Sequence, residues 1–576
     1  MHRSFVINLS LISLVSLLCV QCTPATASPS PTAGLPATQT NQPYNTSGPT
    51  TTSQALPTGT PVETLAHTPP TVLTSTTGPK TPTPSSYNWL QFNGSSEHTG
   101  VNAVETTITP SNVKTLARLY QVTLPAIEDG ALVYLSNVST PKGQRNLLFL
   151  TTKAGHILAL DAFTGGEIWS HQYPAGSCQI NNTGGPCYTA SSPAIDPNLN
   201  FIYSYGLDGA VHKYQVGDGT EIKNGGWPET ATLKPYNEKE SPALSIATTN
   251  IGASYLYVSN GGNLGDRGDY QGHITAINLA DGSQRVFNAL CSDQAVHFAE
   301  TPGIPDCPEV QTAIWARPGV VFDKDTQKIY MSTGNGTYNP ANHHWGDTVF
   351  ALNPDGTGAN GNPLDTYTPA NYLDLQKTDA DLGSTAPAIL PTPPNSKILH
   401  MAVQGGKDQL LRLINLDNLS GQGGTGHTAG EIGPIIPVPQ GGEVFSSPAT
   451  WSNPADSSAW TFVTTANGIS GIKIKVDSSG NPSLSPVWSN ATGGSSPVLV
   501  NGILFYASSG KVLGLDPLTG SQLWSSSPIG GIHWESPVVV NGVLYITDES
   551  SHLTAFSLNG VSPISTSRIY LPSIQA

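Results

Sequence analysis

The stretch LALDAFTGGEIW, from Leu158 to Trp169, joins a short alternating apolar run to an Asp and Thr-Gly turn and then to a tryptophan. Asp, Thr and Gly supply turn chemistry, so the stretch predicts a strand, a tight turn and a second strand. The same order of residues returns at Val512–Trp524 as VLGLDPLTGSQLW. Weaker copies are ITAINLADGSQ (Ile274–Gln284), VFALNPDGTG (Val349–Gly358) and LRLINLDNLSG (Leu411–Gly421). Recurrence every few tens of residues predicts a repeat protein.

A second recurring motif, a Ser-Pro or related pair followed by an apolar strand, counts the units. It occurs as SSPAI, ESPAL, STAPAIL, FSSPAT, SSPVLV and ESPVVV, and ALVYL at Ala131 and ARPGVVF at Ala316 take the same place with altered residues. Eight units too small to bury their own faces must pack against each other, and radial closure protects their strand edges. We therefore expect an all-β fold, an eight-bladed propeller of four-stranded antiparallel sheets, with seven blades as the alternative. Ala117–Leu124 is expected to supply the strand that closes the ring.

The composition supports a sheet protein and excludes one class of partner. The 576 residues include 59 Gly and 48 Pro, and only 11% are charged. Few charges and many turn formers suit short strands with frequent turns. The net charge is −15 and no basic cluster stands out, so no nucleic-acid partner is expected.

The first residues predict export. His2 and Arg3 precede an apolar run of signal-peptide length, and a Thr-, Pro- and Ser-rich stretch that is too polar to bury a core follows. Cys22 is a candidate for lipidation, although Gln21 stands where a small residue is usual, so free secretion and lipid anchoring at the cell surface both stay open. The expected organisation is a signal peptide (1–22), a disordered linker (23–86), the propeller (87–560) and a C-terminal tail (561–576).

Four cysteines lie beyond the leader, in two closely spaced pairs. In an exported chain they predict two local disulfides, because each pair brackets a short loop. Metal binding is the weaker interpretation, because neither pair has CxxC spacing. The expected pairs are Cys178 with Cys187, and Cys291 with Cys307.

Beyond the repeats, the chain resembles the pyrroloquinoline quinone (PQQ) propeller proteins, the quinoprotein alcohol dehydrogenase-like superfamily. WLQFNGSSEHTGVN (Trp89–Asn102) and ITPSNVKTLARLYQVTLP (Ile108–Pro125) are similar to that family's lead-in before its first blade. The A-x-D-x-x-T-G-x-x-x-W pattern of the stretch at Leu158 resembles the family's tryptophan-docking motif. The resemblance covers about Trp89 to Gly560 and implies the propeller fold, whereas function depends on the site.

The resemblance also implies site residues for PQQ and Ca²⁺. AIWARPGVVF and MSTGNG resemble the family's segments with the ring-stacking tryptophan and a cation ligand, which would be Trp315 and Asn335. The family's base would be Asp381 or, second, Asp379, and either carboxylate could share the metal. GGKD is similar to the stretch with a basic residue at the quinone oxygens, here Lys407. Each has an ordinary alternative: inter-blade packing for the tryptophan, a turn for the asparagine, solvated loop acids for the aspartates and a surface hairpin for the lysine.

The chain departs from the family at three points. The family's acidic Ca²⁺ ligand precedes a strand similar to QGHITAINLADG, but the sequence before it contains no Glu and leaves Asp266 or Asp269 in its place. The adjacent cysteine pair of several quinoprotein dehydrogenases is missing. No CxxCH occurs, so no covalently attached haem is expected and electrons would leave through a separate acceptor.

Two functions therefore stand side by side. The first is an exported PQQ- and Ca²⁺-dependent dehydrogenase that oxidises an alcohol, a sugar or a polymer hydroxyl. The second is a noncatalytic surface propeller that binds a protein or a glycan. The ordered TGN, DADLG and GGKD stretches favour the first, and the long linker and the missing Glu favour the second. Membrane contact is expected only through the possible N-terminal lipid.

Overall fold

The structure is a computed structural model that describes residues 86–173, 187–263, 265–421, 424–426 and 428–563. All of them belong to one compact unit, Thr81–Ala576. The predicted signal peptide, nearly all of the predicted linker, Cys178 and most of the predicted tail lie outside these residues and stay predictions. None of the helices among the described residues has the length and apolar character that crossing a bilayer requires.

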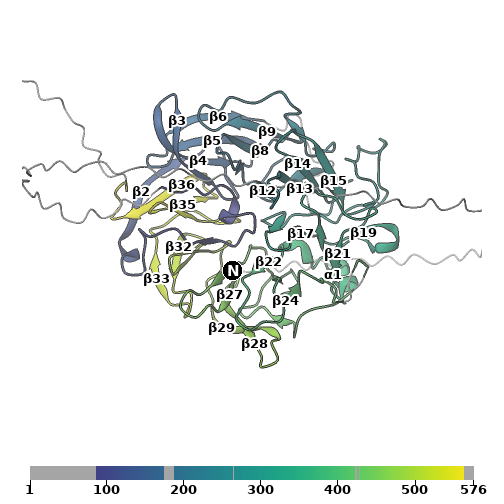
Figure 1. Cartoon of the computed structure of the whole chain (residues 1–576). Helices are drawn as coiled ribbons and strands as arrows, with labels where there is room; N and C mark the ends of the chain where they lie inside the picture. The colour runs from purple at the N-terminus through teal and green to yellow at the C-terminus, as the bar shows by residue number, and fades with distance from the viewer. Residues whose placement is uncertain (1–85, 174–186, 264, 422–423, 427, 564–576) are drawn as a thin grey trace, which may run out of the picture. The chain divides into compact units, whose positions relative to one another are not determined.

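Eight blades, each built on a four-stranded antiparallel sheet, surround one axis and form a propeller (Figure 1). Two of the sheets have a fifth strand: β11 (Glu238–Glu240) pairs antiparallel in blade 3, and β1 (Val101–Asn102) pairs parallel in blade 7. The innermost strands are β3 (Val133–Thr140), β7 (Ala194–Ile195), β12 (Ser245–Thr248), β16 (Val321–Asp323), β22 (Ala388–Leu390), β26 (Ala449–Ser452), β30 (Val498–Val500) and β34 (Val538–Val540). Each begins at or just after one of the eight predicted blade-start motifs. The prediction of eight blades is confirmed, and the seven-bladed alternative is wrong.

The other three strands of each blade follow outward in chain order. The second strands are β4 (Gly143–Thr151), β8 (Phe201–Tyr205), β13 (Ser254–Gly262), β17 (Lys328–Ser332), β23 (Met401–Gln404), β27 (Ala459–Thr465), β31 (Ile503–Ser508) and β35 (Val543–Asp548). The third are β5 (His156–Asp161), β9 (Ala210–Gln215), β14 (His273–Asn278), β20 (Val349–Leu352), β24 (Leu410–Asn415), β28 (Gly468–Val476), β32 (Lys511–Leu515) and β36 (His552–Leu558). The outer strands are β6 (Glu167–Gln172), β10 (Glu229–Thr230), β15 (Gln284–Asn288), β21 (Asp365–Tyr367), β25 (Ile436–Pro437), β29 (Pro482–Asn490), β33 (Gln522–Ser525) and, in blade 8, β2 (Leu116–Thr123).

Strand β2 closes the ring, as predicted. It pairs antiparallel with β36, from Leu116 opposite Leu558 to Thr123 opposite His552. In Figure 1 the purple N-terminal strand lies beside the yellow C-terminal strand. Blade 8 therefore combines strands from the two ends of the propeller, which holds the ring closed.

The repeated turn motif works as a clamp between neighbouring blades. Asp161 Oδ1 accepts hydrogen bonds from the backbone N–H of Phe163 and Thr164, at 3.0 and 3.1 Å, which fixes the turn. Trp169 Nε1 then donates to the Val216 carbonyl of blade 2 at 3.0 Å. A Cβ at Gly219 of that blade would lie 2.6 Å from the Trp169 ring, so only glycine allows this approach.

The same clamp recurs later in the ring. Trp488 of blade 6 donates to the Pro517 carbonyl of blade 7 at 2.9 Å, and a Cβ at Gly520 would lie 2.4 Å from its ring. Trp524 of blade 7 donates to the Leu116 carbonyl of the closing strand at 3.2 Å. The apolar clusters also draw on adjacent blades, so each sheet is buried by its neighbours.

The lead-in segment Tyr87–Asn102 fills the axial channel. It hydrogen-bonds, through main-chain or side-chain atoms, to seven of the eight innermost strands in succession. The strand residues that it contacts are Tyr134, Ile195, Ile246, Phe322, Thr450, Leu499 and Val539. The segment therefore packs along the inner strands around most of the ring.

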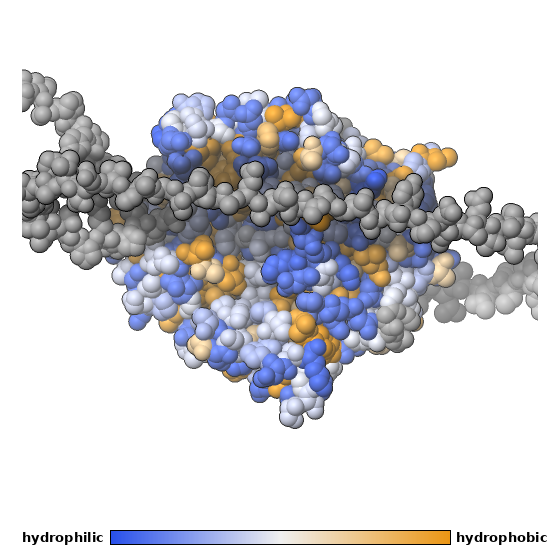
Figure 2. Space-filling model, in the orientation of Figure 1, coloured by the Kyte–Doolittle hydropathy of each residue, from blue (hydrophilic) through white to orange (hydrophobic). Residues whose placement is uncertain are grey.

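The remaining described features are small. Helix α1 (Tyr372–Thr378) lies between blades 4 and 5, and a disulfide joins Cys291 to Cys307. On the face shown in Figure 2, hydrophilic and hydrophobic residues are interspersed rather than gathered into one apolar patch, as far as the grey atoms leave it visible. The predicted pairing of Cys178 with Cys187 stays a prediction.

Candidate functional site

The repeat register places one residue of each blade around the axis at the end where the innermost strands begin. This position lies three residues before the proline of the blade-start motif, or before Leu132 in blade 1. We call the eight residues the axial ring. They are Asp129, Ala190, Lys239, Trp315, Ser384, Phe445, Gly494 and Trp534.

Three aromatic members of the axial ring meet, although they come from blades 4, 6 and 8. The ring centroid of Trp315 lies 5.9 Å from that of Phe445 and 6.2 Å from that of Trp534. Only residues near the axis can touch across blades that are not adjacent. A cavity of about 510 Å³ lies beside Phe445 and Trp534, which line it together with Arg317, Glu443, Ile532, His533 and small residues of blades 6 and 7.

Arg317 fills the layer between the aromatic residues and the lead-in segment. Its guanidinium carbon lies 5.4 Å from the Trp534 ring centroid and 5.8 Å from that of Phe92. The side chain is buried and surrounded by acids, which include Glu128 and Glu535. Burial raises the pKa of Glu128 to about 7 and that of Glu535 to about 9, so both carboxyls hold protons near neutral pH more readily than exposed acids do.

Asp381 is the centre of a second polar group beside the aromatic residues. Its Oδ1 accepts a hydrogen bond from the backbone N–H of Asn335 at 2.9 Å, and its Oδ2 lies 2.9 Å from Lys407 Nζ. Lys407 Nζ also lies 2.8 Å from Asp379 Oδ1. Asp381 is buried, whereas the side chain of Asp379 is 61% exposed. The structure therefore separates the two candidate bases, with Asp381 inside and Asp379 at the surface.

Trp315 connects this polar group to the aromatic residues of the axial ring. Lys407 Nζ lies 5.4 Å from the Trp315 ring centroid, within range of a cation–π contact. A Cβ at Gly334 would lie 3.2 Å from both Trp315 Nε1 and the Asp381 carboxyl carbon. The glycine of the MSTGNG stretch thus leaves room for the indole and the carboxylate to approach each other.

Asn335 extends the group to a third carboxylate. Its side-chain Nδ2 donates to Asp266 Oδ2 at 3.1 Å. Asp269, the other candidate for the family's missing Glu, instead pairs with Lys234 at 3.0 Å and accepts a hydrogen bond from Thr301. Of the two, Asp266 is the one at the site. We call Asp266, Asn335, Asp379, Asp381 and Lys407 the Asp381 cluster.

The surroundings of Asp381 favour this residue as a proton acceptor. Burial raises the pKa of Asp381 above its usual value, although Lys407 opposes the shift. Burial lowers the pKa of Lys407, but the carboxylates of Asp381 and Asp379 outweigh it and raise the pKa overall. Asp347, whose Oδ1 accepts the Leu382 N–H at 3.0 Å, is also buried, and its pKa is raised to about 8. The lysine thus stays charged beside an aspartate with an elevated pKa.

The structure therefore links Trp315, Asn335, Asp379, Asp381 and Lys407 through a chain of contacts, whereas the candidate Asp269 lies elsewhere. It also adds Phe445, Trp534 and Asp347, which the sequence analysis did not single out. A signal for the two aromatic residues existed. WARP, FSSP and WESP place an aromatic residue at the same point of three motifs.

The comparisons with known proteins agree with this architecture. The family described as glucose/ethanol/alcohol dehydrogenase, beta-propeller domain, matches residues 89–357, and the family of outer membrane protein assembly factor BamB matches residues 453–562. No curated protein matches the chain.

Two solved structures share the fold at low sequence identity. A europium-containing methanol dehydrogenase is 15% identical with a TM-score of 0.57, and the match covers 82% of this chain and 98% of that one. A quinohemoprotein alcohol dehydrogenase from Pseudomonas putida HK5 is 14% identical with a TM-score of 0.56, over 82% of this chain and 81% of that one. The protein is an eight-bladed β-propeller. More specifically, residues 89–357 match a PQQ-type propeller domain, which confirms the resemblance noted from the sequence.

Proposed function

We propose that the Asp381 cluster and Trp315 form the site of a PQQ- and Ca²⁺-dependent dehydrogenase that acts on an alcohol, a sugar or a polymer hydroxyl. The observation that carries the proposal is the meeting of Trp315, Asn335, Asp381 and Lys407 in one place. Trp315 and Asn335 come from blade 4, Asp381 precedes the first strand of blade 5, and Lys407 follows its second strand. The fold brings these separate segments into contact.

The side chains at this site suit both Ca²⁺ and PQQ. Ca²⁺ prefers carboxylate and amide oxygens, which Asp381, Asp266 and Asn335 possess. Asn335 contacts both carboxylates, through its backbone N–H to Asp381 and its side-chain Nδ2 to Asp266, so its side-chain amide would have to turn to present its oxygen to the ion. Trp315 offers a flat face for a planar ring, and its aromatic neighbours Phe445 and Trp534 line a cavity. Bound PQQ would supply the two-electron acceptor, and Ca²⁺ would polarise its carbonyls.

The chain's own residues would handle the proton and the charge. Asp381 accepts the proton of the substrate hydroxyl at a carboxylate oxygen, and its raised pKa strengthens it as a base near neutral pH. Lys407 stays protonated beside Trp315 and stabilises negative charge that develops there. The two roles need a buried acid and a permanent cation in contact, which is the arrangement observed. We further propose export to the cell surface or medium, where a separate acceptor takes the electrons.

A thermal melt of the full chain tests the proposal. Melting temperatures are compared with PQQ, with Ca²⁺, with both and with neither. Ligands that bind only the folded state raise the melting temperature, so we expect an increase that requires both. A dye-linked assay with simple alcohols and sugars follows. It compares wild type with Asp381→Asn and uses Asp417→Asn, a substitution at an exposed aspartate, as the matched control. No shift at saturating ligand would contradict the proposal.

The second candidate is a noncatalytic propeller that binds a protein or glycan partner. One observation favours it. Lys407 already lies 2.9 and 2.8 Å from Asp381 and Asp379, so these carboxylates have a cation without any metal. A melting temperature that responds to neither PQQ nor Ca²⁺ would favour this function.

A further inference from the structure

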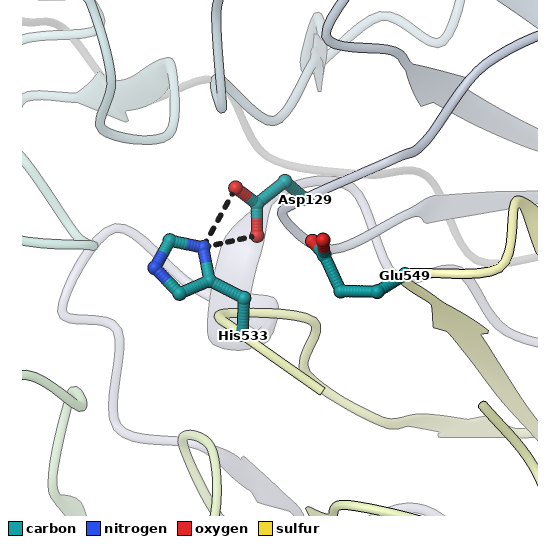
Figure 3. A group of neighbouring side chains, drawn as sticks. All are labelled: Asp129, His533 and Glu549. Carbon is teal, nitrogen blue, oxygen red and sulfur yellow. Dashed lines mark hydrogen bonds and ion pairs between the residues drawn. The ribbon is translucent and has the colours of Figure 1, made fainter. Parts of the chain in front are cut away.

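We propose that Asp129, His533 and Glu549 form a binding site for a divalent transition metal such as Zn²⁺, separate from the Asp381 cluster. One ligand atom from each side chain lies within 4.8 Å of the other two. Figure 3 shows the three side chains converging, with the Asp129 carboxylate between the imidazole and the Glu549 carboxylate. His533 Nδ1 lies 3.1 and 2.9 Å from the two Asp129 oxygens.

The backbone holds these three residues in place. Asp129 Oδ1 accepts the Trp534 N–H at 3.2 Å, and Glu535 Oε2 accepts the His533 N–H at 2.6 Å. The Glu549 N–H donates to the Gly531 carbonyl at 2.9 Å. The loop that carries the imidazole is therefore fixed on both sides, and metal binding would need little reorganisation of the main chain.

Lys153 already contacts two of the three side chains and must be displaced by the metal. Its Nζ lies 3.0 Å from Asp129 Oδ2 and 2.9 Å from Glu549 Oε1. Lys153 is half-buried and its long side chain can turn to solvent, so a dication can displace it and neutralise both acids.

The ligand types select the class of metal. One imidazole nitrogen and two carboxylate oxygens suit Zn²⁺ and similar transition ions, which bind such atoms at about 2.0–2.2 Å. Ca²⁺ takes six to eight oxygen ligands and gains little from the imidazole.

The site would join the first blade to the last. Asp129 precedes β3 of blade 1, whereas His533 and Glu549 flank β34 and β35 of blade 8. A metal there would bridge the seam at which the ring closes. Because the three residues come together only in the closed ring, binding should stabilise the folded state.

Isothermal titration of the chelator-treated full chain with Zn²⁺ tests the proposal. We expect one ion per chain and a raised melting temperature. His533→Gln and Glu549→Gln should each weaken binding at least about 10-fold, and His400→Gln, which changes an exposed His–Asp pair, should leave it unchanged. Lys153→Gln should strengthen binding, because it removes the competing cation.

Three outcomes would overturn the proposal: no binding, binding that survives both ligand substitutions, or weaker binding in Lys153→Gln. The result is independent of the proposed function, because Asp381→Asn should keep Zn²⁺ binding while it loses the response to PQQ and Ca²⁺. If wild type responds to PQQ and Ca²⁺ but not to Zn²⁺, only the metal site fails.

Discussion

Two lysines near the axis have the same kind of partners in different surroundings. Lys407 lies 2.9 Å from Asp381, and Lys153 lies 3.0 Å from Asp129. Each lysine also contacts a second, more exposed carboxylate, and both aspartates are buried. The pKa shifts are nevertheless opposite, since that of Asp381 is raised and that of Asp129 is lowered.

The difference comes from the other neighbours. Lys407 is the only cation among the causes of the Asp381 shift, and the charge of Asp379 works against it. Asp129 has Lys153, Arg317 and the imidazole of His533 around it. A single lysine does not offset burial, whereas three basic groups do. The first aspartate is thus suited to take up a proton, and the second is suited to remain an anion and bind cations.

The largest effect is expected for Asp381→Asn. The amide keeps the shape but accepts no proton, so PQQ- and Ca²⁺-dependent turnover should fall about 10³-fold. The free energy of unfolding should change by less than about 1 kcal/mol, because the amide also removes a buried charge. Dye-linked assays and urea unfolding measure the two quantities. Full activity in the variant would exclude Asp381 as the base.

Asp129→Asn should mainly destabilise the fold, in contrast to Asp381→Asn, which should mainly lower turnover. Removing one partner of a buried ion pair leaves Arg317 and Lys153 without compensation, which costs about 3 kcal/mol. Because the pKa of Asp129 is lowered in the folded state, its stabilisation is present above about pH 4 and is lost as the pH falls through the folded value. Urea unfolding at several pH values should therefore show wild type and variant converging in acid. A difference in the free energy of unfolding that is the same at all pH values would contradict this explanation.

Lys407→Met should move the pH dependence of the reaction. Without its cation the pKa of Asp381 should rise further, so the acidic limb of kcat/KM should shift upward by about one pH unit. Lys153→Met is the matched control and should leave the pH profile in place. If the pH profiles of Lys407→Met and wild type are the same, Lys407 does not influence the pKa of the catalytic base.

The smallest effect is expected for His400→Gln. His400 Nδ1 lies 2.8 Å from Asp417 Oδ1, but 52% of the Asp417 side chain is exposed. An exposed pair contributes less than about 1 kcal/mol. Urea unfolding should show a change below about 0.5 kcal/mol. A larger loss would mean that surface pairs account for part of the effect assigned to Asp129.

Much of the fold could be predicted because the interactions that form each repeat unit involve residues that are close in sequence. The Asp and Gly of the turn and the tryptophan after it act locally, and one bond from Trp169 to the next blade explains why the pattern recurs. Trp315, Asn335, Asp381 and Lys407 could be proposed because their stretches resemble those of a family with a known order. Trp534 and Phe445 were missed, although the register of the blade-start motifs places them beside Trp315.

The sequence by itself determined the eight blades and the closing strand, because these follow from periodicity and local turn chemistry. Only the tertiary structure decided that Asp381 is buried and Asp379 exposed, and that Asp266 rather than Asp269 reaches Asn335. It also brought Asp129 to His533, 404 residues away. Burial and charge around a carboxylate depend on loops from distant blades, and no local pattern encodes which loops meet.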